Sequence, residues 1–325
     1  MKIKEFIEGD FVDYSSYSTL RTIPSYIDGL KNSSRKILFT FLEKNIKEKT
    51  RVDIASNLVV SFSSYIHGSC DGTVVKMCQN FRGTNNIPYF SRDGFFGTTL
   101  NPSASAIRYI KTKNEPYIYD IFKKEDTKVL VAQEFEGAKI EPRFYVPTLP
   151  MLLVNGAEGI ATGFASSILP RNYKELVKYI NGKKCDLTPY FNGFKGTVER
   201  VEEKNQWVIN GKYNLISKNT IEIIELPIGY RHSSYIKVLD KLEDDKVIIS
   251  YKDLCDSKKD LFRFQVKFRM QDNISSKSEE EMMKLLKIQK THSENFTTID
   301  ENNKIRIFES VEDLLDAYIK VKEEY

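Results

Sequence analysis

The residue with the clearest chemical potential is Tyr109, which follows Arg108 directly and stands just before Lys111 and Lys113. A tyrosine phenol can attack a phosphodiester, but its unperturbed pKa of about 10 keeps it protonated at neutral pH, so it needs help from cations or a base. Arg108, Lys111 and Lys113 could provide those cations. Apolar and charged residues also alternate around Tyr109, which fits a half-buried strand. The stretch alone therefore leaves a nucleophile and a plain strand open.

Three further cations, Lys31, Arg35 and Lys36, lie at the predicted start of a helix. A proline and an Asp-Gly pair mark a turn before them, and apolar residues recur at helical spacing after them. Cations are unfavourable near a helix N-terminus unless an anion neutralises them, and the free N–H groups there also bind phosphate. These residues predict either a phosphate contact or a solvated first turn.

Two more amphipathic segments follow, over residues 52–65 and from Ser69 or Asp71 onward, and the second carries Lys76. Three short helices, then the glycine-rich loop 93–97 and a strand-like stretch, predict a winged helix-turn-helix whose later helix enters a DNA major groove. His67 stands at the entry of the third helix. A histidine there would meet a phosphate or serve as an ordinary structural hydrogen-bonding residue.

The composition is that of a globular chain of 325 residues, long enough for one large or two to three ordinary domains. The formal net charge of +4 permits nucleic-acid binding without arguing for it. The four cysteines form no Cys-x-x-Cys pair, and the three histidines complete no zinc spacing with them. Neither a signal-peptide run nor an apolar segment of membrane-spanning length is present, which predicts a cytoplasmic protein with reduced thiols and no membrane partner.

The second half of the chain predicts mixed structure. Residues 172–182 favour a helix ended by glycine, and residues 275–290 and 311–325 are also typical of helices. Asn210-Gly211 is a hairpin signal between strand-like runs. These runs are residues 195–201, 207–209, 220–226 and 264–269.

Several ordered blocks together resemble the DNA breakage-reunion region of type IIA DNA topoisomerases. They are Arg21-Thr22-Ile23-Pro24, Asp28-Gly29-Leu30-Lys31, Tyr65-Ile66-His67-Gly68, Gln79-Asn80-Phe81, Gly94-Phe95-Phe96-Gly97, Arg108-Tyr109, Glu141-Pro142-Arg143, and Asn155-Gly156-Ala157-Glu158-Gly159-Ile160. The match is dense between residues 21 and 170. Within the family it is nearest to the medium subunit of the T-even bacteriophage enzyme, in which cleavage tyrosine, metal-binding domain and ATPase lie on separate chains. The chain departs from the family pattern at Asn32, Ile66 and Ser69.

The resemblance implies an α+β fold of three parts. Residues 1–150 would form a winged-helix, CAP-like breakage-reunion domain that carries the tyrosine. Residues 151–305 would form an α/β tower, or shoulder, domain. Residues 306–325 would begin a coiled-coil helix whose C-terminal dimer gate is absent.

The resemblance also implies the site. Tyr109 would form a transient 5′-phosphotyrosyl bond and make a double-strand break for ATP-dependent strand passage, with Arg108 and His67 as the other catalytic residues. Ile160 would wedge between base pairs, or else be an ordinary core residue. The positions expected to contact DNA are Arg21, Lys31, Arg35, Lys36, Lys76, Lys111, Lys113 and Ile160.

No acidic cluster in the chain looks like a Toprim metal site, and no glycine-rich nucleotide loop is present. Magnesium and ATP are therefore expected on a partner Toprim/ATPase subunit, with no metal ligands in this chain. The other expected partners are double-stranded DNA and a second copy of the chain, in the host cytoplasm if the chain is phage-encoded. Two alternatives remain: a winged-helix DNA-binding module without catalysis, and a scaffold for an ATPase subunit, which would bury Tyr109.

Overall fold

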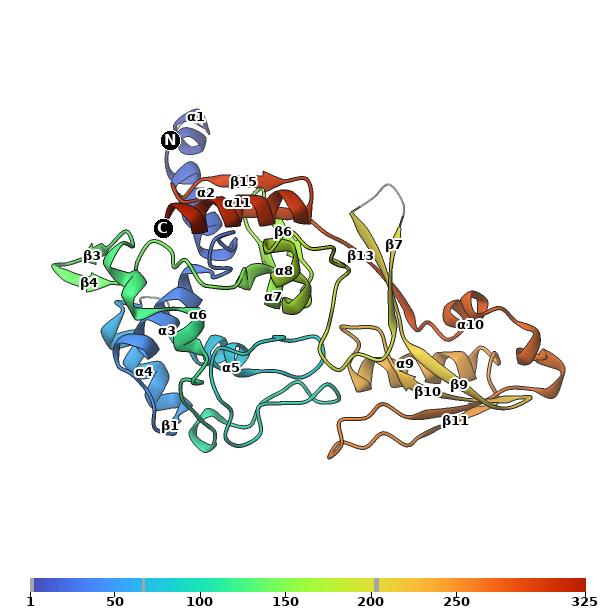
Figure 1. Ribbon diagram of the computed structural model, residues 1–325. Coiled ribbons are helices and arrows are strands. Elements are labelled where there is room, and N and C mark those ends of the chain that lie inside the picture. The colour runs from blue at the N-terminus through green and yellow to red at the C-terminus, as the bar shows by residue number, and fades with distance from the viewer. Residues whose placement is uncertain (1–2, 66–67, 202–204) are drawn as a thin grey trace.

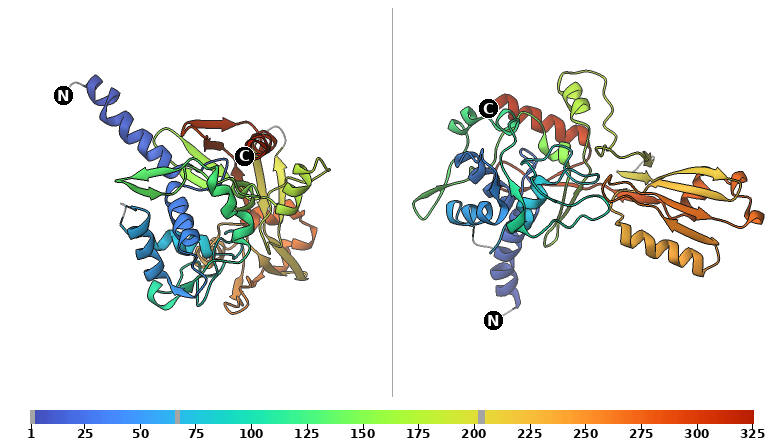
Figure 2. Two further views of the ribbon diagram at one scale, coloured as in Figure 1. Left: turned by 60° about the vertical axis from the view of Figure 1, so that its left-hand side comes forward. Right: turned by 90° about the horizontal axis from the view of Figure 1, so that it is seen from below.

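The computed structural model describes residues 3–65, 68–201 and 205–325, which form two lobes joined by a short sheet (Figure 1). Helices and sheets occur in both lobes, so the predicted mixed α and β class is confirmed. The larger lobe contains the first 180 residues or so and the last thirty. The smaller lobe is elongated and points away from it (Figures 1 and 2).

Three helices form the centre of the larger lobe: α3 (Asn32–Glu43), α4 (Val52–Phe62) and α5 (Asp71–Cys78). They pack against one another through fully buried side chains such as Phe41, Val59 and Val74, as the helical spacing of apolar residues predicts. Before them come α1 (Ile3–Glu8) and α2 (Asp10–Thr22). The N-terminal end of this pair projects away from the lobe (Figure 2).

A small sheet lies beside these helices. β1 (Thr50–Arg51) pairs antiparallel with β2 (Lys111–Thr112). On the other side, Lys111 of β2 bridges Asp93, and Asn114 just after β2 bridges Phe90. The short 3₁₀ turn η1 (Ile107–Tyr109) runs directly into β2. The small sheet therefore fixes the end of the Tyr109 turn on both sides.

The rest of the larger lobe consists of short elements. Two hairpins extend from it, β3 (Gln133–Phe135) with β4 (Ala138–Ile140) and β5 (Ala157–Ile160) with β6 (Ala165–Ile168). The helical pieces are α6 (Ile118–Ile121), η2 (Lys124–Lys128), α7 (Met151–Asn155) and α8 (Tyr173–Ile180). As predicted, α8 is followed by a glycine, Gly182, in the left-handed region at φ 65°.

The smaller lobe is a four-stranded antiparallel sheet with helices on it. Its strands are β9 (Lys212–Ser217), β10 (Thr220–Glu225), β11 (Ser250–Asp253) and β12 (Phe264–Lys267), in the order β11-β12-β10-β9. Two helices, α9 (His232–Asp244) and α10 (Glu279–Leu285), share its core through Leu239 and Met282. Between them run the short turns η3 (Met270–Asp272) and η4 (Ile274–Ser276).

The sheet between the lobes has the order β13-β8-β7, from β7 (Thr197–Val201), β8 (Gln206–Asn210) and β13 (Gln289–Ser293). The predicted hairpin at Asn210-Gly211 is wrong, because β8 and β9 belong to different sheets. The chain crosses between the sheets at Gly211, where a side chain would not fit: an added Cβ would lie 2.5 Å from the Glu225 carbonyl oxygen. Residues 275–290 likewise form only one short helix before β13 begins.

The chain end returns to the larger lobe. β14 (Phe296–Ile299) and β15 (Ile305–Phe308) form a hairpin, and α11 (Val311–Glu324) then packs on the first core. The Tyr318 hydroxyl donates to the Pro147 carbonyl at 2.5 Å. The first core thus includes residues 151–176 and 296–321, so it does not divide at the predicted boundaries of 150 and 305. None of the described helices is long and apolar enough to cross a bilayer.

Candidate nucleic-acid interface

Tyr109 lies on the surface at the end of the η1 turn. Its backbone N–H donates to the Ala106 carbonyl at 2.9 Å, which closes the turn, and the next residue, Ile110, is only 1% exposed. Tyr109 itself is 71% exposed, and Arg108 is exposed as well. The plain-strand alternative is therefore wrong, since a half-buried strand would have turned one of these two side chains inward.

The backbone after Tyr109 is held from two directions. Ile110 accepts a hydrogen bond from the Val52 N–H at 3.1 Å, and Lys111 exchanges two 2.9 Å backbone hydrogen bonds with Asp93. The glycine-rich loop passes close to Ile110 at Gly94, which has a φ of 99°. A Cβ on Gly94 would lie only 3.0 Å from Ile110 Cγ2, so a residue with a side chain would be crowded there. The turn that presents Tyr109 is thus a rigid one.

Arg108 is the cation nearest in the chain to Tyr109, and its guanidinium carbon lies 4.8 Å from the centroid of the tyrosine ring. This cation–π distance places a positive charge over the ring. Lys111 is exposed and Lys113 half-buried. Within the described residues, no hydrogen bond or ion pair joins either lysine to the Tyr109 hydroxyl. An exposed Tyr109 beside a cation contradicts the scaffold alternative, which required a buried one.

The loop that precedes Tyr109 is anchored to the smaller lobe by Arg82 and Asp260. Arg82, 8% exposed, forms an ion pair of 2.6 Å with Glu225 and donates to the Asp260 carbonyl at 2.5 Å. The Asp260 carboxylate accepts hydrogen bonds from the Thr99 hydroxyl at 2.7 Å and the Leu100 N–H at 3.1 Å. Sequence reasoning missed this link because the partners lie more than a hundred residues apart, and no local pattern joins them.

A second group of predicted residues gathers around the start of α3. Lys31 is half-buried there, and burial together with the nearby Lys76 ammonium lowers the pKa of its side chain. Lys76 is exposed on α5 and lines a groove of 710 Å³ between the lobes. Sequence reasoning missed the opposite wall of this groove, to which Arg231, Lys290 and His292 contribute. The groove therefore carries positive charge from both lobes.

Arg35 and Lys36 are corrections to the predicted interface. The Arg35 guanidinium forms a two-pronged ion pair with the fully buried Asp28, at 2.7 Å and 3.0 Å. The Lys36 ammonium donates to Glu141 at 2.9 Å and to the Ser63 carbonyl at 2.7 Å. The anions that neutralise these helix-start cations are the protein's own carboxylates, so neither side chain is available to a phosphate.

Ile160 is the last residue of β5, directly before the loop of the β5–β6 hairpin, and is 85% exposed. The alternative of an ordinary core isoleucine is therefore wrong. The hairpin packs tightly against the end of α2, since a Cβ on Gly159 would lie only 2.3 Å from the Thr22 carbonyl oxygen.

Arg21 is exposed in the last turn of α2, directly before Thr22. His67, the remaining predicted residue, lies outside the described residues.

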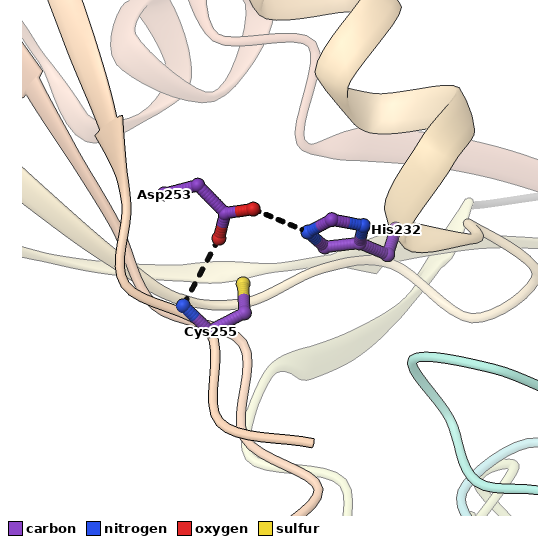
Figure 3. Close-up of side chains that lie close together, drawn as sticks. All are labelled: His232, Asp253 and Cys255. Carbon is purple, nitrogen blue, oxygen red and sulfur yellow. Dashed lines mark hydrogen bonds and ion pairs between the residues drawn. The ribbon is translucent and has the colours of Figure 1, made fainter.

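The carboxylates on the segments that pair with Lys111 do not form a metal site. Asp53 is held by Arg51 at 2.8 Å, and Asp93 by Lys49 at 3.3 Å. The only described residues that bring three metal-ligating side chains together are in the smaller lobe, where His232 and Asp253 lie beside a cysteine, Cys255 (Figure 3). The residues around Tyr109 therefore do not fit a magnesium ion of their own.

Comparison with known proteins places this arrangement in a family. The family model for the A-type chain of DNA gyrase/topoisomerase IV matches residues 21–325, nearly the whole sequence. The chain belongs to this family. Within it, the chain is similar to the mitochondrial DNA topoisomerase 2 of Dictyostelium discoideum, with 38% identity over 98% of this chain and 25% of that protein. The DNA topoisomerase 2 of Acanthamoeba polyphaga mimivirus is 34% identical over 73% of this chain and 20% of its own length.

A solved structure of the same family is also similar. The crystal structure of the DNA-binding, cleavage and re-ligation domain of Plasmodium falciparum topoisomerase II superposes with a TM-score of 0.90 at 31% identity. It covers 98% of this chain, which spans 45% of the crystallised one. The chain thus spans about a quarter of the two curated relatives and under half of this structure. A particular closeness to the bacteriophage medium subunit stays a prediction.

Proposed function

We propose that this chain is the DNA cleavage and religation part of a type IIA topoisomerase, with Tyr109 as its nucleophile. One observation supports this most directly: in a chain of the DNA gyrase/topoisomerase IV family, Tyr109 is 71% exposed on a rigid turn with the Arg108 guanidinium over its ring. A nucleophile must reach a large substrate from outside, and a nearby cation favours the phenolate that attacks.

The proposed reaction is an in-line displacement at phosphorus. The Tyr109 oxygen attacks a backbone phosphate, its proton goes to solvent, and the 3′-oxygen of the neighbouring nucleotide leaves. A 5′-phosphotyrosyl bond replaces the phosphodiester, so the backbone can be resealed by the reverse reaction without an added energy source. Arg108 would stabilise the extra negative charge on the five-coordinate phosphorus, which is the usual role of arginine in phosphoryl transfer. His67 is proposed to assist in the same step.

The remaining predicted cations would hold the duplex. We place its path along the groove between the lobes, where Lys76 and Lys290 lie on opposite walls and Lys31 is close to Lys76. In this proposal α3, α4, α5 and the small β1–β2 sheet act as a winged helix. The smaller lobe then acts as the tower, and α11 as the start of a coiled coil. Arg21, Lys111 and Lys113 would contact flanking phosphates.

The other components are proposed from the chemistry. Phosphoryl transfer of this kind uses a divalent ion to balance charge on the phosphate oxygens, and the carboxylates next to Tyr109 are already paired with Arg51 and Lys49. We therefore propose that magnesium and ATP are bound by a Toprim/ATPase module outside these residues. One tyrosine cuts one strand, so a double-strand break requires a two-fold dimer of the chain.

A cleavage assay tests this function. The purified chain is mixed with supercoiled DNA, magnesium and a Toprim-bearing partner, and the reaction is stopped with denaturant. We expect linear DNA with protein covalently attached to its 5′ ends. DNA binding without any covalent adduct would instead favour the alternative of a non-catalytic DNA-binding module.

Lys76 should contribute to binding through its charge alone. We expect Lys76→Ala to lower the slope of log affinity against log salt concentration by about 1, because one fewer phosphate contact releases one fewer counterion. The folded state should be almost unaffected, since the side chain is exposed. Fluorescence anisotropy with a DNA duplex at several salt concentrations measures the slope. Lys320→Ala, which removes an exposed lysine on α11, is the matched control, and an equal change in that variant would refute the assignment.

Ile160 should act on DNA shape. Separating two stacked base pairs costs about a few kcal/mol. An apolar side chain inserted between them bends the duplex, and the bent duplex contacts more protein surface, which offsets that cost. We expect Ile160→Ala to reduce the bend angle while the unfolding free energy changes by less than about 0.5 kcal/mol. Energy transfer between dyes at the two ends of a duplex reports the bend. Ile307→Ala, at another exposed isoleucine, should leave the bend intact, and an unbent wild-type complex would contradict the wedge.

A further inference from the structure

Three side chains with different ligand atoms meet in the smaller lobe. His232 is the first residue of α9, Asp253 is the last of β11, and Cys255 follows two residues later. Their imidazole nitrogen, carboxylate oxygen and thiol sulfur all lie within 4.8 Å of one another. Figure 3 shows the three groups turned toward a common point. We propose that His232, Asp253 and Cys255 bind a zinc-class transition-metal ion.

The fold holds each of the three groups in place. The His232 ring stacks on Phe264, with centroids 5.7 Å apart and planes inclined by 21°. Cys255 is brought beside Asp253 because its backbone N–H donates to Asp253 Oδ1 at 3.0 Å (Figure 3). The other carboxylate oxygen, Oδ2, lies 2.7 Å from His232 Nε2. The imidazole and the carboxylate are thus oriented toward each other before any ion is added.

The distances need only a small adjustment to accept an ion. Two ligands at about 2.1 Å from a tetrahedral centre are about 3.4 Å apart. The nitrogen and oxygen, now 2.7 Å apart, would separate slightly, and the sulfur would move inward from its present position. The His232 and Asp253 side chains are 31% and 35% exposed, so water can complete the fourth position.

The ligand types select the metal. A thiolate, an imidazole and a carboxylate suit zinc and its neighbours, whereas magnesium requires an octahedral set of oxygens. The thiolate and the carboxylate together neutralise a doubly charged ion. When the metal binds, the thiol proton leaves to solvent, and the proton that His232 Nε2 donates to Asp253 is released from that nitrogen, so that the ring is protonated at Nδ1 instead. The ligand set therefore differs in chemistry from one that would hold magnesium.

Burial and the Asp253 carboxylate raise the pKa of the Cys255 thiol, which lies 3.7 Å from the Arg263 carbonyl oxygen, so the thiolate needs a bound cation. The Arg263 backbone N–H donates to Cys255 Sγ at 3.3 Å, and a hydrogen bond of this kind stabilises negative charge on a ligating sulfur. The Arg263 guanidinium is itself paired with Glu222 at 2.7 Å. A bound ion would fasten the start of α9 to the end of β11, two elements already joined by the His232–Asp253 contact and by a hydrogen bond from the Tyr251 hydroxyl to Asp240.

Cobalt(II) provides a direct test because a cobalt–thiolate bond absorbs in the near ultraviolet. The whole chain, freed of metal with a chelator, is titrated with cobalt and then with zinc. We expect one cobalt per chain with a charge-transfer band, its loss on adding zinc, and no effect of excess magnesium. Absence of the band in the wild-type chain would overturn the proposal without any variant.

Variants assign the ligands. Cys255→Ser should abolish the band, and His232→Ala should weaken binding by at least about tenfold, since even residues behind the ligands cost that much. Cys185→Ser is the matched control, because Cys185 is another partly exposed free cysteine, and it should keep the band. Circular dichroism confirms that each variant is folded. A band that survives in Cys255→Ser, a cobalt affinity that is unchanged in His232→Ala, or a band that disappears in Cys185→Ser would also overturn the proposal.

Discussion

We expect Tyr109→Phe to abolish the covalent DNA complex while DNA affinity stays within about twofold of the wild type, a difference well under the 1.4 kcal/mol that makes a factor of ten. The substitution removes the attacking oxygen and keeps the ring that lies under Arg108. Because Tyr109 is 71% exposed and closes its turn through the backbone, the unfolding free energy should change by less than about 0.5 kcal/mol. Denaturing gels measure the adduct, and anisotropy measures the affinity.

The control for this variant is Tyr173→Phe, which removes the hydroxyl of another exposed tyrosine in the same lobe. That variant should form the adduct at the wild-type rate. An adduct that persists in Tyr109→Phe would mean that a different residue attacks the phosphate, and the proposed mechanism would fail. Loss of DNA binding together with the adduct would mean that the hydroxyl serves binding, which also contradicts the proposal.

Arg35→Ala should destabilise the larger lobe by about 3–5 kcal/mol, because it leaves a buried carboxylate without its partner. Asp28 is fully buried and accepts two hydrogen bonds from Arg35, as well as one each from the Leu30 and Tyr145 N–H groups. The Asp28 carboxylate therefore joins the segment that contains Leu30 and Arg35 to the segment that contains Tyr145. Urea denaturation followed by circular dichroism gives the unfolding free energy.

Comparison of Arg35→Ala with Lys76→Ala separates a structural role from a DNA contact. Lys76→Ala should keep the stability of the wild type and bind DNA with a salt slope lower by about 1, whereas Arg35→Ala should lose stability. If Arg35→Ala were as stable as the wild type and bound DNA more weakly, the phosphate contact expected from sequence would have been right. The ion pair with Asp28 would then carry little of the folding energy.

The Arg108-Tyr109 stretch alone left a nucleophile and a strand open, and the resemblance of the surrounding blocks to one family singled out Tyr109, whose role as the nucleophile stays a prediction. Arg108 and Tyr109 are adjacent, and the surrounding blocks have a spacing that resembles one family. Ile160 was likewise singled out by the resemblance to a family motif; the structure shows that it is exposed, and its role as a wedge stays a prediction. Cations at a helix start were less informative, because the sequence does not show whether a bound phosphate or a carboxylate of the protein neutralises them. Lys36 is neutralised by Glu141, which lies 105 residues further along the chain.

In the second half of the chain, two predictions from local sequence were wrong because pairing between distant segments determined the structure. Asn210-Gly211 is typical of a hairpin, yet its glycine is used for a close approach to Glu225 where the chain changes sheets. Residues 289–293 follow a helix but pair with β8 as a strand, because an edge was open there. The groove between the lobes is likewise formed by residues that are far apart in the sequence. Its basic walls come from residues such as Lys76 and Lys290 that no sequence window contains together.

The extent of the domains was also set by tertiary contacts. The resemblance implied a boundary at residue 150, but α7 supplies four buried residues to the first core. The final helix returns to that core, where Leu314 and Leu315 are completely buried. Apolar spacing predicted that this helix exists, and it could not predict which surface the helix covers.

The most direct test of the central claim is to find the atom to which DNA becomes attached. Cleavage complexes formed with magnesium and a Toprim-bearing partner are trapped with denaturant, digested with nuclease and protease, and analysed by mass spectrometry. The account predicts a nucleotide joined through its 5′-phosphate to the peptide that carries Tyr109. Attachment to any other residue, or through a 3′-phosphate, would contradict it.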